Sequence, residues 1–419
     1  MYRKTVLNNG IRIVTEHIPH VQSVSIGIWV KTGSRDENKE ENGTAHFIEH
    51  MLFKGTKKRS ALQIAKEIDA VGGILNASTS REYTNFFAKV LDKDFDLAID
   101  LLSDIFLNSL FPSQEVKRER GVIFQEIKMV EDTPDEYVQD LFSQHFFPGH
   151  PLGYPILGNY ATITKITRPK LAEFFQNYHL NPLRIIVSVA GKLNHDQVVD
   201  AIDRTLGKIK PKTEARMWSP PEAFPGIKIF NKNLEQIHLC MGSLGISQTH
   251  PSRYAGYILN AILGGSMSSR LFQEIREKRG LAYAVFSYNA SFQDTGILTI
   301  YAGTARDKLK KVIELIMNEI RKLKTKPLGK NELAKAKDQL KGNILLLWEN
   351  TDVRMSRLAT GEIYFKKYIP LRQVLTTIEH VTVDDVQSLS QELFQKKNFS
   401  LVALGKVKEG DIPSGILTV

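Results

Sequence analysis

The stretch that decides the fold of this chain is RIIVSVAGKL, at residues 184–193. It is a run of β-branched and aliphatic residues ending in a Gly-Lys turn, which is typical of a strand buried in a sheet. The same pattern returns 214 residues later as NFSLVALGKV, at residues 398–407. Two segments with helical apolar spacing, residues 98–105 and 312–319, are separated by the same 214 residues. The chain is therefore expected to contain a duplicated α+β domain of about 200 residues.

A proline-rich segment lies between the two copies. Residues 210–226 contain four prolines and no sustained periodicity, so they form the expected linker. This predicts an N-terminal domain over residues 1–209 and a C-terminal domain over residues 227–419.

Composition narrows the class of protein. The chain has 419 residues, 42% of them hydrophobic, and a single cysteine, so a framework of internal disulfides is excluded. No run approaches the roughly 18 apolar residues of a membrane span, and the N-terminus lacks the apolar core of a secretory signal. Asn9-Gly10 predicts instead a hairpin turn between two strands. We expect a soluble protein of the cytoplasm that does not bind membranes.

The net charge of +10 raises the question of nucleic-acid binding. The basic clusters are short, dispersed and interleaved with acidic residues, and no nucleic-acid-binding motif accompanies them. Solvated basic faces explain the charge better, so no nucleic-acid partner is expected.

The clearest chemical signal is TAHFIEHM, at residues 44–51. On a helix, residues four apart share one face, so His46 and His50 can present their imidazoles to one ion. Glu49 falls on nearly the same face. Two imidazoles, a carboxylate and an open position are typical of a catalytic zinc site, and this is the inverted zincin motif. The alternative is a buried histidine pair on a core-facing helix.

Such a site needs a third ligand, and the helical pattern over residues 113–127 contains two candidates. Glu119 and Glu126 are seven residues apart, hence on one face of that helix. Buried carboxylates need a cation or donors. Spacing alone favours a third metal ligand on this helix no more than it favours a solvated acidic edge.

The motif from His46 to His50, followed after 75 residues by Glu126, resembles the pitrilysin/insulinase family of zinc peptidases. The branch that it resembles is the mitochondrial-processing-peptidase type with its bacterial homologues. The resemblance extends over the whole chain through FKGT at 53–56, GGILNA at 72–77, HPLG at 150–153, PILG at 155–158 and RLFQEIREKRGLAY at 270–283.

This resemblance implies a role for each motif residue. His46, His50 and Glu126 would bind zinc, Glu49 would act as the general base, and Glu119 would support the metal ligands. Asn76 and Ala77 would lie in an edge strand along which peptide substrates add as a further strand. Arg276 and Tyr283 would engage substrate carbonyls; the residues alone suggest only a surface arginine and a core tyrosine.

The second copy has lost the metal-binding residues. The positions of His46, Glu49 and His50 are occupied there by Gly256, Leu259 and Asn260, and that of Glu126 by Asn343. One zinc ion per chain is therefore expected.

The resemblance also implies an architecture and an activity. Each domain would be a mainly antiparallel sheet flanked by helices, and the chain would form half of a clamshell. The expected protein is a zinc-dependent endopeptidase that hydrolyses short or unfolded peptides inside a closed chamber. Because one chain carries both the zinc motif and the Arg–Tyr pair, a homodimer with each site completed by the partner is expected. The alternative is a non-catalytic scaffold subunit of a processing-peptidase-like complex.

Overall fold

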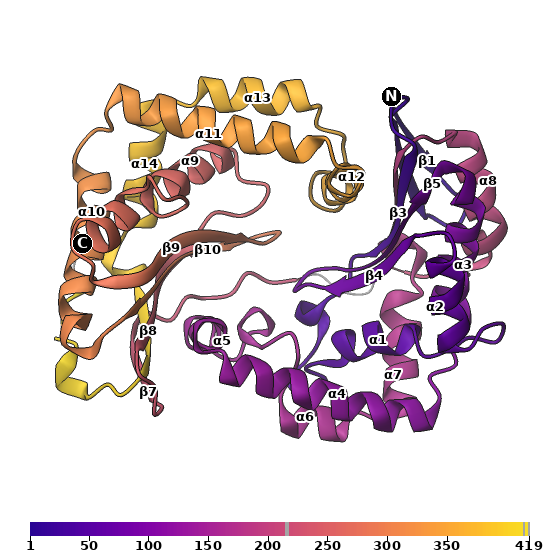
Figure 1. The fold of residues 1–419 in the computed structure, drawn as a ribbon, viewed down its shortest axis with the longest axis horizontal. Helices are drawn as coiled ribbons and strands as arrows, with labels where there is room; N and C mark the ends of the chain where they lie inside the picture. Colours follow the sequence, from indigo (N-terminus) through magenta and orange to yellow (C-terminus); the bar gives the residue numbers. More distant parts are fainter. Residues whose placement is uncertain (214–217, 414, 418–419) are drawn as a thin grey trace. The chain divides into compact units, whose positions relative to one another are not determined.

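The computed structural model describes residues 1–213, 218–413 and 415–417 (Figure 1). Of the expected linker over residues 210–226, residues 214–217 lie outside the described residues. The chain forms two compact units, each assembled from three separate segments. The first unit comprises Met1–Lys128, Tyr154–Trp218 and Leu346–Tyr368, and the second comprises Met129–Gly153, Ser219–Leu345 and Ile369–Val419.

A six-stranded sheet forms the centre of the first unit. Its strands, in spatial order, are β1 (Tyr2–Val6), β2 (Arg12–His17), β6 (Ile185–Gly191), β3 (Ser23–Val30), β5 (Thr84–Leu91) and β4 (Ile74–Thr79). All neighbouring pairs are antiparallel except β2 with β6. The hairpin expected at Asn9-Gly10 joins β1 to β2, and Gly10 takes the positive φ of 97° that such a turn requires.

Among the residues that the structure describes, the sheet of the second unit repeats this order without an equivalent of β1. Its strands are β7 (Gly226–Asn231), β11 (Ser400–Gly405), β8 (Ile237–Gly245), β10 (Gly296–Thr304) and β9 (Ala282–Ser291). Again one pair is parallel, β7 with β11, and the others are antiparallel. The two stretches with the repeated Gly-Lys pattern form β6 and β11, which occupy equivalent positions in the two sheets. The expected α+β fold of two homologous domains is confirmed.

Helices surround both sheets. The helices with most of their length in the first unit are α1 (Thr44–Leu52), α2 (Ala61–Asp69), α3 (Phe95–Asn108), α4 (Ser113–Asp132), α6 (Tyr160–Lys165), α7 (Arg168–Phe174), α8 (His195–Thr205) and α12 (Thr351–Phe365). Those of the second unit are α5 (Pro134–Phe146), α9 (Arg253–Leu263), α10 (Leu309–Thr325), α11 (Lys330–Trp348), α13 (Leu371–His380) and α14 (Val383–Leu393).

The compact units differ from the expected domains over residues 1–209 and 227–419 because each contains a helix from the other half of the chain. Helix α12, orange in Figure 1, packs on strands β2, β3 and β6 of the first unit. Helix α5 packs on β8 and β11 of the second unit. The apolar side chains of α12, including Met355 and Ile363, meet Trp29 and Ile186 in one buried cluster.

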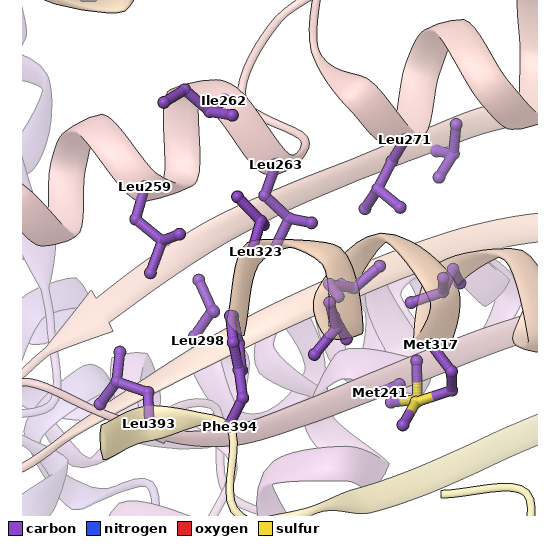
Figure 2. Close-up of a cluster of buried hydrophobic side chains, with 14 of the residues drawn as sticks. Met241, Leu259, Ile262, Leu263, Leu271, Leu298, Met317, Leu323, Leu393 and Phe394 are labelled. Carbon is purple, nitrogen blue, oxygen red and sulfur yellow. The ribbon is translucent and has the colours of Figure 1, made fainter. Parts of the chain in front are cut away.

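This exchange explains why the central strands are apolar on both faces. Every residue of β6 is buried, since α12 covers one face and the unit's other helices cover the opposite one. In the second unit, Phe142 of α5 and Cys240 of β8 lie in the equivalent cluster. On the opposite face of each sheet, the hydrophobic core contains more residues than the cluster around the exchanged helix. Figure 2 shows the one in the second unit, where Leu259 and Leu263 of α9 point toward Leu298 of β10.

Membrane-spanning helices were not expected. Within the described part of the chain, no helix combines the length and the apolar character needed to cross a bilayer.

Candidate metal centre

The two histidines of the motif lie on α1, whose entry is sterically specific. Gly43 precedes the helix with φ 95°, a conformation that glycine adopts without strain. A Cβ on Gly43 would stand 2.5 Å from Ile163 Cδ1 and 2.8 Å from the carbonyl oxygen of Leu157. A glycine at position 43 is therefore needed to bring the chain into α1 at this point.

The N-terminus of α1 is held by a buried carboxylate. Glu37 accepts hydrogen bonds from the backbone N–H groups of Gly43 and Ala45 at 2.8 and 2.7 Å, and from Asn42 Nδ2 at 3.1 Å. These donors satisfy the side chain of Glu37, which is 0% exposed. Burial raises the pKa of Glu37 to about 8, and the same hydrogen bonds oppose this shift. They fix the position of the turn that carries His46.

Three side chains converge at the centre. The Nε2 atoms of His46 and His50 each lie 3.6 Å from Glu126 Oε2. The three ligand atoms are all within 4.8 Å of one another. Two ligand atoms bound about 2.1 Å from a tetrahedral ion are about 3.4 Å apart, so the spacing fits zinc.

The polar environment also fits a cation. Glu126 Oε2 is buried and has no hydrogen-bond partner among the described residues. Burial, with a smaller effect from His50, lowers the pKa of His46 to about 3. His46 is therefore neutral, as a metal ligand must be, and cannot neutralise Glu126 itself. A divalent cation would satisfy the carboxylate and both imidazoles.

Glu49 lies beside these ligands and is held by the edge strand. Thr79 Oγ1, at the end of β4, donates a hydrogen bond to Glu49 Oε2 at 2.5 Å. Burial raises the pKa of Glu49, while the bond from Thr79 and the nearby His50 oppose this shift. A carboxyl group whose pKa is raised is better suited to accept and return a proton near neutral pH.

Glu119, two turns before Glu126 on α4, is not a solvated edge residue. It is 3% exposed, and its Oε2 lies 3.1 Å from His50 Nδ1. Its Oε1 forms an ion pair with Lys54 Nζ at 2.8 Å. Tertiary structure thus separates two glutamates that spacing alone did not distinguish: Glu126 faces the Nε2 atoms and Glu119 faces the opposite nitrogen of His50.

The expected substrate residues lie on two different elements. Asn76 and Ala77 are in β4, which ends the sheet of the first unit and is paired only with β5 along its described length. Arg276, in the short helix Phe272–Glu277 of the second unit, stacks over the rings of Phe272 and Tyr283 at 4.8 and 5.2 Å. Tyr283 is 78% exposed, so it is not a core residue.

The equivalent region of the second unit has other roles. Gly256 and Leu259 of α9 are buried in the hydrophobic core, and Asn260 accepts a hydrogen bond from Ser287 at 2.7 Å. Asn343 is exposed on α11. In the described portion of the chain, His46, His50 and Glu126 are the one group with metal-ligand spacing.

Residues that contact the motif had not been singled out from the sequence. Lys54 belongs to the FKGT stretch noted for its resemblance, and Thr79 lies two residues beyond GGILNA, but nothing in the spacing assigns either of them a partner. Nothing in the sequence indicated a structural role for Glu37. An acidic side chain that bonds to the start of a helix six residues downstream has no distinctive local pattern.

Comparison with known proteins gives matches along most of the chain. Residues 12–159 match the family model described as insulinase (peptidase family M16). Residues 165–340 match the model described as peptidase M16 inactive domain.

Relatives cover the full length. The chain is 40% identical over 414 residues to "Uncharacterized zinc protease YmxG" of Bacillus subtilis (strain 168), covering 99% of this chain and 100% of that protein. It is 38% identical to "Uncharacterized zinc protease SCO5738" of Streptomyces coelicolor, covering 97% and 90%. The fold matches a crystal structure of a protease from Helicobacter pylori with a TM-score of 0.89, at 23% identity over 97% of this chain and 99% of that one.

Proposed function

Because the chain belongs to peptidase family M16, we propose that it is a zinc-dependent endopeptidase with one zinc site per chain. The observation that carries the proposal is the convergence of His46 Nε2 and His50 Nε2 on Glu126 Oε2, at 3.6 Å each. No further group in the described residues has this spacing, which supports one zinc per chain. The names of its relatives as zinc proteases agree with this choice of metal.

Each residue then has a defined task. Zinc, when bound, supplies Lewis acidity that activates a water molecule and polarises the scissile carbonyl. Glu49 takes the proton of the attacking water on its carboxylate and passes it to the leaving amine. Thr79 holds Glu49 Oε2, so the carboxylate keeps one orientation during both transfers. His46, His50 and Glu126 bind the metal and need not change protonation state.

The proposed substrates are short or unfolded peptides. A peptide in extended conformation can pair with the open edge of β4 beside Asn76 and Ala77, and the end of this strand is bonded to Glu49 through Thr79. Main-chain pairing of this kind requires a substrate backbone in extended conformation, which a short or unfolded peptide can adopt freely. Arg276 and the exposed Tyr283 would contribute donors to substrate carbonyls, in a chamber formed by a homodimer.

Zinc analysis and peptide hydrolysis test the proposal together. The purified chain should contain about one zinc per chain and cleave a quenched peptide library. Incubation with 1,10-phenanthroline followed by desalting should abolish cleavage, and added zinc should restore it. A Glu49→Gln variant should retain zinc but lose cleavage, because an amide cannot accept the proton.

The matched control is Glu40→Gln, since Glu40 is an exposed glutamate in the loop before α1. This variant should cleave like the wild type. A zinc-loaded wild-type chain that cleaves no peptide would instead indicate the non-catalytic scaffold. Cleavage that is insensitive to the chelator would contradict the proposed site.

A further inference from the structure

A buried carboxylate lies between the metal-ligand helix and a lysine that the motif does not include. Glu119 presents Oε2 to His50 Nδ1 at 3.1 Å and Oε1 to Lys54 Nζ at 2.8 Å. Lys54 lies two residues beyond the end of α1, and its backbone N–H donates to the carbonyl of Met51 in the last turn, at 3.1 Å. The three side chains therefore form a continuous series from Lys54 through Glu119 to His50.

Lys54 supplies the positive charge in this series. The side chain of Glu119 is 4% exposed, whereas that of Lys54 is 29% exposed, so the lysine keeps contact with solvent. A buried carboxylate is costly unless a cation or several donors meet it. Among the described residues, the ion-pair partners of Glu119 are Lys54 and His50. A metal-bound His50 is a neutral imidazole, so Lys54 is the partner that carries a full charge.

The orientation of His50 depends on where Glu119 is held. A ligand histidine commonly donates its second N–H to a carboxylate, which fixes the ring and leaves the other nitrogen for the metal. Here an Nδ1–H directed at Glu119 aims Nε2 at the position shared with Glu126. His46 has no such support, because its Nδ1 is buried without a hydrogen-bond partner among the described residues. The orientation of His50, unlike that of His46, therefore relies on Glu119.

We propose that Lys54 is a positioning residue of the zinc centre, which anchors Glu119 Oε1 so that Oε2 holds His50 in its metal-binding orientation. The inference rests on the proposed function, since it requires zinc at His46, His50 and Glu126. It goes beyond that function because Lys54 touches neither the metal nor a substrate, yet determines how tightly the metal is held.

Zinc affinity tests this role independently of peptide cleavage. The dissociation constant is measured for the metal-free protein by competition with a chelator of known affinity. Loss of a partner behind a metal ligand typically weakens binding about 10- to 100-fold, and this range is expected for Lys54→Met. Lys54→Arg keeps the positive charge and should stay within about threefold of the wild type. Lys54→Gln provides a second neutral variant if Lys54→Met does not fold.

The matched control is Lys58→Met. Lys58 is a nearby lysine whose side chain is 59% exposed, and it pairs with Asp100, which is 46% exposed. An exposed pair of this kind contributes little, so zinc affinity should not change.

A double-mutant cycle separates positioning from general stabilisation. If Lys54 acts through Glu119, the double variant Lys54→Met/Glu119→Gln should bind zinc no more weakly than Glu119→Gln alone. If the two substitutions instead weaken zinc binding additively, Lys54 does not act through Glu119, and the proposal is wrong. The proposal would also be overturned by a folded Lys54→Met or Lys54→Gln variant that binds zinc as tightly as the wild type, even if its melting temperature is lower. A wild-type chain that binds no zinc would overturn the proposed function itself, which distinguishes the two failures.

Discussion

Thr79, the last residue of the edge strand β4, donates a hydrogen bond of 2.5 Å to Glu49 Oε2. The strand proposed to receive the substrate and the carboxylate proposed to move the proton are thus directly joined. A peptide that adds to β4 would be aligned on the same element that orients the base. This relationship links substrate placement to chemistry through Thr79.

Thr79→Val should therefore impair turnover rather than binding. Valine keeps the shape of threonine but cannot donate, and hydrogen bonds to charged groups contribute about 1.5–3 kcal/mol. We expect kcat to fall by about tenfold or more, with little change in KM or zinc content. Steady-state kinetics on a quenched peptide measure this. Ser78→Ala is the control, because Ser78 bonds to Asn85 instead of Glu49. An unchanged kcat for Thr79→Val would contradict the role.

Removal of a ligand should empty the metal site. Glu126→Gln and His46→Ala each delete one of three protein ligands, and the remaining two are insufficient for stable binding. After dialysis, metal analysis should find close to no zinc in either variant, and peptide cleavage should be absent. His20→Ala, at an exposed histidine, should keep the zinc content of the wild type. Full zinc retention by Glu126→Gln would reassign the third ligand.

The exchanged helix α12 should be important for stability. Met355 is 1% exposed and packs in the cluster around Trp29, so Met355→Ala should lower the free energy of unfolding by about 2–5 kcal/mol. The same substitution at Met267, which is 75% exposed, should change it by less than about 0.5 kcal/mol. Chemical denaturation of both variants measures the difference. Similar values for the two would mean that α12 adds little to the core of the first unit.

The proposed homodimer predicts complementation between inactive chains. Glu49→Gln damages the zinc side of the site, and the pair Arg276→Ala/Tyr283→Phe damages the other side. If each site combines the two sides from different chains, equal mixing with subunit exchange should restore about a quarter of wild-type activity. A mixture of Glu49→Gln with Glu126→Gln damages the same side twice and should stay inactive. Continued inactivity of the first mixture would argue against shared sites.

The fold was predictable in part, and the reason is periodicity. The repeat of RIIVSVAGKL and NFSLVALGKV identified β6 and β11 as equivalent strands because a buried strand has an unbroken apolar run. The exchange of α5 and α12 was not predictable. An apolar stripe indicates that a helix is covered, but both sheets of a duplicated fold offer similar apolar faces, and only long-range packing selects one.

The candidate site was also predictable only in part, for the same reason. The sequence by itself determined the association of His46, Glu49 and His50, because residues three and four apart on one helix share a face whatever the rest of the chain does. Spacing alone did not rank Glu119 against Glu126. The tertiary structure places Glu126 Oε2 beside both Nε2 atoms and Glu119 beside His50 Nδ1. It also brings Thr79 and Lys54 to the motif. Those contacts depend on where α4, β4 and the end of α1 lie in space, and local spacing carries no information about distances between separate elements.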